Sequence, residues 1–242
     1  ELLFGMLLVL VLSDMEKDMF PVMKVFKDAK NFYVLAISML LLLETKRFAP
    51  LSSVFNIFLP FFVYALVPLV FSNALFTSIQ KTVSYGLMFL IVPNFVLYGF
   101  RRQGWVFLRN LVFFMTLILL FGFVVNAIDY EFAHVAGRFR GLFGNPNGMA
   151  IYCYLLLMLA SVVNALNKDI FSFRERLVVF GTIIYFLIMS GSRASLASSA
   201  MFLIFHRFFA YSALLGLVGL VFMILAVEVV SSNLEALIGA LG

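Results

Sequence analysis

Nine apolar runs, separated by short polar connections, constrain this chain more than any other feature of its sequence. They are Leu2–Leu12, Phe32–Leu43, Val54–Phe71, Thr82–Phe100, Val106–Phe121, Met149–Leu166, Leu177–Met189, Ala194–Phe205 and Leu214–Val230. Hydrophobic residues make up 64% of the chain and charged residues 12%, whereas a soluble domain averages about 45–50% and about 25%. A chain of 242 residues cannot hide this much apolar surface from water, so the sequence predicts an integral membrane protein.

These runs are expected to be helices, because backbone groups in hydrocarbon need partners within their own segment and strand alternation is absent. We predict an all-α fold: one polytopic transmembrane bundle over residues 1–242, with about nine helices. The runs 177–189 and 194–205 are the shortest neighbouring pair, and one kinked helix is an alternative to two helices. One continuous helix would be roughly 43 Å long against a bilayer core of about 30 Å. Ser190-Gly191-Ser192-Arg193 is also rich in turn and cap residues, which favours two helices.

The remaining global features carry little functional information. The chain begins at Glu1 and ends soon after an apolar run, which is typical of a fragment of a longer protein, and no cleavable signal peptide is visible. Cys153, the single cysteine, lies in an apolar run and is predicted to be a packing residue. The net charge of +5 is spread over loop ends, so we assign it to topology and expect no nucleic-acid partner.

Basic residues set the predicted orientation. If every run crosses the membrane, four basic clusters share one side: Lys46/Arg47, Arg101/Arg102, Lys168/Arg174/Arg176 and Arg207. The positive-inside rule makes that side cytoplasmic. Arg138, Arg140 and Arg193 lie on the opposite side, where topology does not explain them. Arginine beside hydrocarbon is costly, so each of these three needs a partner or a task.

The first of the unexplained arginine sites is the loop 126–148, which is predicted to lie outside the cytoplasm. From Arg138 to Ala150 the chain reads R-F-R-G-L-F-G-N-P-N-G-M-A. Asn145-Pro146-Asn147-Gly148 predicts a turn followed by a helix start, at which Pro146 fixes φ and Asn147 can cap.

A helix N-terminus with flanking arginines is a natural phosphate cradle. Gly141 and Gly144 allow the backbone to approach a ligand closely. The alternative is a loop with ordinary capping and arginines that snorkel to the interface.

The second site is Ser190-Gly191-Ser192-Arg193-Ala194-Ser195. Ser192 can cap the following helix, and Arg193 stands at the positive end of that helix dipole, which is unfavourable unless an anion is bound. Snorkelling to lipid phosphates is the alternative. Together the two sites suggest one cationic pocket for an anionic substrate at one membrane face.

His134 shares the first loop with two carboxylates, Asp129 and Glu131. A histidine beside carboxylates can act as a general base, although a loop histidine is more often merely solvated, so His134 is a weak candidate. The sequence contains no metal-ligand spacing, and we expect neither a metal nor another cofactor.

The two motifs and their spacing resemble those of the O-antigen ligase and polymerase superfamily of bacterial envelope proteins. The resemblance covers about residues 137–209, and the flanking helices agree only in hydropathy. It implies a GT-C-like integral glycosyltransferase of the bacterial inner (cytoplasmic) membrane, with its active face periplasmic. Its donor would be a glycan on undecaprenyl pyrophosphate, and its acceptor a hydroxyl of a growing glycan, of lipid A-core or of a protein.

The resemblance also assigns roles to residues. Arg138 and Arg193 match the arginines thought to bind the donor pyrophosphate, and Arg140 is the rival of Arg138. Gly141, Asn145, Pro146, Asn147 and Ser192 would support them. The family histidine implicated as the base would lie beyond Gly242. Physical chemistry agrees in part, because two arginine sites could offset the charge of a pyrophosphate leaving group without a divalent metal.

Two other classes compete with an enzyme. A lipid-linked-glycan transporter or flippase would also need arginines and broken helices, but distributed through the membrane depth. A non-catalytic scaffold would give no reason for three arginines on one face. The clustering at one face favours the inverting, metal-independent transferase.

Overall fold

Nearly all of the described part of the chain is helical. The computed structural model describes residues 52–232, together with residues 5, 36, 39, 40, 42 and 43. The helices are α3 (Ser52–Leu66), the 3-10 turn η1 (Val67–Phe71), α4 (Leu75–Gln103), α5 (Trp105–Ile128), α6 (Tyr130–Ala133), α7 (Pro146–Leu166), α8 (Phe173–Met189), α9 (Arg193–Tyr211) and α10 (Ala213–Ser232). Strands β1 (His134–Val135) and β2 (Arg138–Phe139) form one antiparallel hairpin. This arrangement agrees with the predicted all-α class.

Three helices in the described region are long and apolar enough to cross a membrane. They are α4, α5 and α7, with mean hydropathies of 1.6, 2.6 and 2.0 over their most apolar windows. Nearly all of the predicted run Leu2–Leu12 and most of Phe32–Leu43 lie outside the described residues. A membrane bundle of about nine spans therefore stays a prediction.

The core lies where α5, α7 and α8 pack together. Val112 and Leu119 of α5, Leu156 of α7, and Ile183 and Phe186 of α8 are almost completely buried. Ala150 and Ala160 of α7 are also buried and let neighbouring helices approach closely, as small residues do between membrane helices. Large apolar side chains elsewhere on the same helices remain exposed, among them Leu117, Phe121, Ile151 and Leu155.

The chain reverses at a three-residue break between α8 and α9. Ser190 is still in a right-handed helical conformation, whereas Gly191 has φ +61° and Ser192 is extended. A left-handed residue ends an α-helix, and glycine adopts it without the steric cost of a Cβ. The interpretation of the sequence as two helices is confirmed here.

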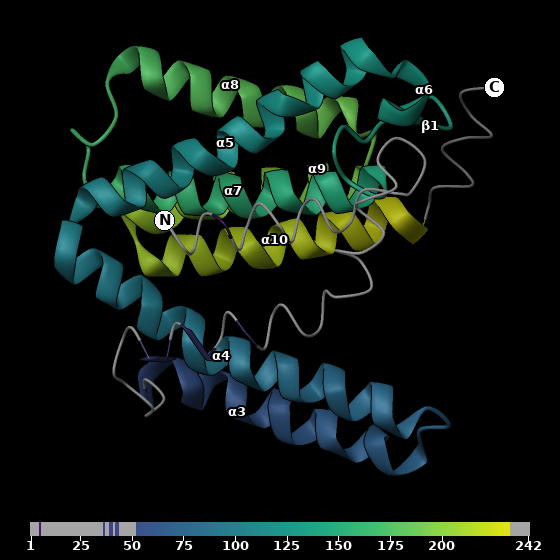
Figure 1. The fold of residues 1–242 in the computed structure, drawn as a ribbon. Coiled ribbons are helices and arrows are strands. Elements are labelled where there is room, and N and C mark those ends of the chain that lie inside the picture. The colour runs from purple at the N-terminus through teal and green to yellow at the C-terminus, as the bar shows by residue number, and fades with distance from the viewer. Residues whose placement is uncertain (1–4, 6–35, 37–38, 41, 44–51, 233–242) are drawn as a thin grey trace.

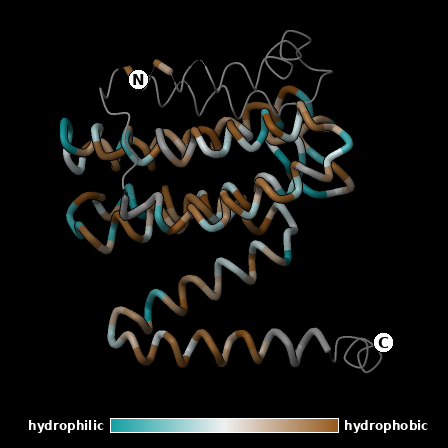
Figure 2. The backbone as a smooth tube through the Cα atoms, turned by 90° about the horizontal axis from the view of Figure 1, so that it is seen from below, coloured by the Kyte–Doolittle hydropathy of each residue, from teal (hydrophilic) through white to brown (hydrophobic). Residues whose placement is uncertain are grey.

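The turns between the helices lie at two opposite ends of the bundle (Figure 1). The α4–α5, α7–α8 and α9–α10 turns lie at one end, with Arg101, Arg102 and Lys168 near them. The α5–α7 connection and the α8–α9 turn lie at the other end, with Arg138 and Arg193. Figure 2 shows the hydrophilic residues concentrated toward these ends and the apolar residues along the helices. This is the distribution that a membrane-crossing bundle requires.

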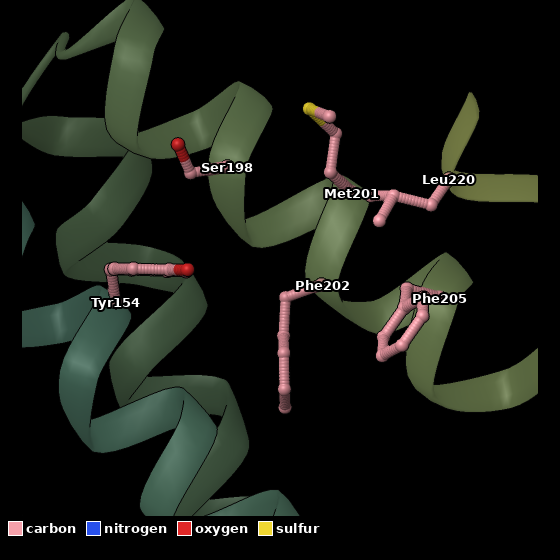
Figure 3. A pocket seen from close by; sticks show the side chains of 6 residues that line it. All are labelled: Tyr154, Ser198, Met201, Phe202, Phe205 and Leu220. Atoms are coloured by element: carbon pink, nitrogen blue, oxygen red, sulfur yellow. The ribbon is translucent and has the colours of Figure 1, made fainter. Parts of the chain in front are cut away.

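Helix α10 packs against α9 and forms an outer layer of the bundle (Figure 2). Gly216 makes the contact close, because a Cβ there would lie 2.8 Å from the Phe209 Cβ. A cavity of about 260 Å³ remains between α7, α9 and α10. Its lining is mostly apolar and consists of Tyr154, Ser198, Met201, Phe202, Phe205 and Leu220 (Figure 3).

Cysteine accessibility tests the two-ended arrangement. Glu131 and Lys168 are both exposed and lie at opposite ends of α7, whereas the native Cys153 is fully buried and gives little background. We expect Glu131→Cys to react with an impermeant thiol reagent in intact spheroplasts, and Lys168→Cys to react only after permeabilisation. The reverse pattern would invert the orientation, and equal labelling of both variants in intact spheroplasts would show that α7 does not cross.

Candidate anion-binding site

The loop between α5 and α7 is a compact structure rather than an open coil. Asp129 caps the short helix α6, with its Oδ1 accepting from the Phe132 N–H at 2.9 Å. The hairpin β1–β2 follows and turns at Ala136 and Gly137, whose φ angles are +50° and +74°. Two left-handed residues in succession match the twist of a two-residue hairpin turn. The loop therefore holds its arginines in defined places.

The hairpin separates His134 from Arg138. His134 pairs with Phe139 and Val135 pairs with Arg138, and directly paired residues share a face of a hairpin. The His134 ring also stacks on Tyr130 at 4.1 Å and lies edge-on to Phe139 at 5.2 Å. His134 therefore stands on the face opposite Arg138. A base role for His134 stays a prediction, and this geometry does not favour one beside Arg138.

Arg140 forms its hydrogen bonds with its own loop. Only 9% of it is exposed; its Nε donates to the Phe132 carbonyl at 2.5 Å and its Nη1 to the Gly144 carbonyl at 3.2 Å. Its guanidinium also lies over the Phe132 ring, 4.5 Å from the centroid. These contacts give the buried charge the partners that a low-dielectric site demands. Arg140 is thus the less suitable of the two loop arginines for a ligand.

Arg138 instead joins the two motifs. Its Nε donates to the Ser190 carbonyl at 2.7 Å, and its Nη2 donates to the Asn147 Oδ1 at 2.8 Å. Gly191 lies directly beneath the same side chain, because a Cβ at that position would be 3.1 Å from Arg138 Nε. The structure therefore brings the arginine of the first motif onto the turn that precedes Arg193.

The start of α7 differs in detail from the prediction. Asn145, not Asn147, is the N-cap: its Oδ1 accepts from the Gly148 N–H at 2.6 Å, and Pro146 occupies the first helical turn. Asn147 holds Arg138 instead. The assignment of the cap to Asn147 was wrong, because proline is favoured at the first helical position and the cap then precedes it.

Gly141 packs the loop on the bundle. It has φ +57°, is buried, and its backbone lies against Gly122 of α5, so that a Cβ there would be 3.4 Å from the Gly122 Cα. The expected close approach is thus made by the protein's own backbone.

The start of α9 has no side-chain cap. Ser192 is buried and makes no capping hydrogen bond; its Oγ lies 3.2 Å from the Ser195 Oγ. The backbone N–H groups of residues 193–195 find no acceptor among the described residues. Arg193 is exposed, and its guanidinium makes no hydrogen bond or ion pair with any described residue. Free N–H groups and a free cation at the positive end of a helix dipole are suited to an anion.

Sequence reasoning placed Ser190 and Gly191 in a turn but did not predict their contacts with Arg138. Ser190 also ties the turn together, since its Oγ donates to the Leu187 carbonyl at 2.6 Å and accepts from the Ser192 N–H at 3.2 Å. A glycine in a helix break was a visible signal for Gly191. The Ser190 carbonyl gave none, because any residue supplies one.

We compared the chain with protein-family models, curated proteins and solved structures. No protein-family model, curated protein or solved structure matches this chain. Among the described residues there is no group of three or more His, Cys, Asp or Glu side chains placed to hold a metal ion.

The different surroundings of Arg140 and Arg193 predict different stability effects. Arg140→Ala removes the donor to the buried Phe132 carbonyl and to the half-buried Gly144 carbonyl, and it should lower the free energy of unfolding by about 2–4 kcal/mol. Arg193→Ala removes no hydrogen bond or ion pair with the described residues, and it should change the free energy of unfolding by less than about 0.5 kcal/mol. Thermal unfolding of the purified protein in detergent, followed by exposure of Cys153 to a thiol-reactive dye, measures both. Equal losses would contradict the structural assignment of Arg140.

Proposed function

We propose that this chain carries the donor-binding part of a membrane-embedded glycosyltransferase of the O-antigen ligase or polymerase type. It would transfer a glycan from undecaprenyl pyrophosphate to a hydroxyl acceptor at the periplasmic face of the bacterial inner membrane. Placement in that membrane is part of the proposal.

One observation carries most of the weight. Arg138 donates to the Ser190 carbonyl, and this contact joins the two arginine motifs at the uncapped start of α9. Two arginines from distant parts of the sequence thereby lie at a helix N-terminus that lacks a capping acceptor. A polar anion with several oxygens is the ligand that such a site suits best.

The arginines differ in what they can offer a pyrophosphate. Arg138 donates Nε–H to the Ser190 carbonyl and one Nη2 hydrogen to Asn147, so its Nη1 donors remain for a ligand. Arg193 has its full fork available. Arg138 therefore provides a cation held in a fixed orientation, and Arg193 provides bidentate contacts.

The chemistry follows from this placement. The acceptor hydroxyl oxygen attacks the anomeric carbon, and the bond from that carbon to the phosphate oxygen breaks with its electron pair remaining on the oxygen. Attack opposite the leaving group inverts the anomeric centre. The arginines and the α9 N–H groups stabilise the charge that develops on the departing pyrophosphate. The hydroxyl proton passes to a general base, for which the resemblance predicts a histidine beyond Gly242.

A lipid-linked donor also needs a place for its hydrocarbon chain. The apolar cavity between α7, α9 and α10 shares α9 with the arginine site, and Ser198 in its lining is five residues after Arg193. Five helical residues correspond to roughly 7.5 Å along the axis. A polyprenyl chain that descends from a pyrophosphate at Arg193 would pass this cavity.

Arg193→Lys in the full-length protein tests the proposal. Lysine keeps the charge at the helix start but loses the planar fork, and loss of one charge-assisted hydrogen bond costs about 1.5–3 kcal/mol, or roughly tenfold to a hundredfold in rate. We expect a corresponding loss of surface polysaccharide when the variant complements a deletion strain.

Arg174→Lys is the matched control, because Arg174 is also exposed at a helix start but lies at the opposite end. It should retain full activity, and membrane levels of both variants are measured in parallel. Wild-type glycan from a normally expressed Arg193→Lys variant would refute a substrate-binding role for Arg193.

A further inference from the structure

A second cavity, with a more polar lining than the first, lies at the opposite end of the bundle from the arginine motifs. It has a volume of about 510 Å³, within the roughly 300–1,000 Å³ range of small-ligand sites. It opens between the start of α5, the α7–α8 loop and the start of α8. Its lining consists of Trp105, Val106, Arg109, Asn167, Asp169, Ile170, Ser172 and Glu175.

Protein contacts already satisfy the glutamate in this cavity. Glu175 accepts from the Ser172 backbone N–H at 2.8 Å with one oxygen and pairs with Arg109 Nη2 through the other. Ser172 and Glu175 together form a capping box at the start of α8. This carboxylate therefore fixes Arg109 and has little capacity left for a ligand.

Other polar groups of the lining remain available. Arg109 uses Nη2 for Glu175, which leaves Nη1, and its buried Nε has no hydrogen-bond partner among the described residues. Asn167 uses its Oδ1 to accept from the Asp169 N–H, which leaves its amide donors. The exposed Asp169 carboxylate makes no hydrogen bond or ion pair within the described region. The lining thus contains cationic and amide donors together with one free carboxylate.

The position of the cavity narrows the class of ligand. Trp105 is the first residue of α5, directly after the α4–α5 turn, and it is the single tryptophan of the chain. Tryptophan at the end of an apolar helix is typical of the membrane–water interface. In a bundle that crosses the membrane, this position of Trp105 would place the cavity at the level of the lipid headgroups.

We propose that this cavity binds the headgroup of a zwitterionic aminophospholipid, with the phosphate at Arg109 and Asn167 and the ammonium at Asp169. Arg109 donors suit a phosphate. A primary ammonium donates hydrogen bonds to a carboxylate, whereas the quaternary ammonium of phosphatidylcholine cannot. Phosphatidylglycerol has no cation for Asp169 to attract. The site should therefore favour phosphatidylethanolamine over both. This proposal needs only the membrane placement in the proposed function, not the transfer reaction.

Native mass spectrometry of the full-length protein tests this selectivity. Detergent-solubilised protein is titrated with phosphatidylethanolamine, phosphatidylcholine and phosphatidylglycerol of equal chain length. We expect the first lipid bound to be phosphatidylethanolamine, with about threefold to fivefold preference, as one partly exposed charge pair supplies. Asp169→Asn should abolish the preference, and Glu131→Gln, an exposed carboxylate at the opposite end, should keep it.

A second variant addresses the phosphate. Arg109→Lys keeps a cation beside Glu175 but loses the guanidinium fork, and it should weaken retention of all three lipids. Cys153 burial reports that each variant is folded.

Equal retention of the three lipids, preference for phosphatidylglycerol, or an unchanged preference in a folded Asp169→Asn variant would each overturn the proposal. Extraction of the protein from membranes by alkaline carbonate would instead refute the membrane placement. Loss of transfer activity in Arg193→Lys has no bearing on either result.

Discussion

The hydrogen bond from Arg138 Nε to the Ser190 carbonyl connects parts of the chain that are 52 residues apart. It fixes the loop between α5 and α7 against the turn between α8 and α9. The α8–α9 turn can receive it because Gly191 leaves room for the arginine stem. Without this contact the two arginine motifs would lie at the same end of the bundle but would not touch each other. With it they belong to a single local structure.

The three arginines at this end differ in burial and in hydrogen-bond partners, and these differences determine which of them are available to a ligand. Arg140 is buried and its donors meet carbonyls of its own loop. Arg138 uses Nε and Nη2 for hydrogen bonds within the protein, and Arg193 has no hydrogen-bond or ion-pair partner in the described region. Desolvation makes an unpaired buried guanidinium very costly, so the buried arginine must be the paired one. Arg193, exposed at the helix start, keeps its whole guanidinium free of hydrogen bonds and ion pairs with the described residues.

The sequence predicted the helical elements well where composition determines them. The run Met149–Leu166 ends where α7 ends, and the run Leu177–Met189 ends where α8 ends. The break at Ser190–Ser192 also followed from local chemistry, since a glycine between serines favours a turn. These outcomes depend on short-range preferences that a single sequence contains.

The arrangement of the site depended on contacts that local preferences do not contain. A left-handed Ala136 turns the hairpin, although alanine disfavours that conformation. Asn145 and Asn147 are chemically identical, and only their geometry assigns one to the helix cap and the other to Arg138. Which arginine turns inward was likewise decided by the fold of the loop. The motifs indicated a candidate site, and tertiary packing determined which contacts each arginine makes.

The uncapped start of α9 has a thermodynamic consequence. A helix end without acceptors frays, and its amide protons exchange with solvent from locally opened states. An anion bound there would act as the missing cap, and part of its binding free energy would go into ordering the first turn of α9. The stability of this first turn would then rise with the concentration of the anion, because a ligand that binds only the ordered state stabilises that state. Amide hydrogen exchange at residues 193–195 would follow occupancy of the site without any catalytic turnover.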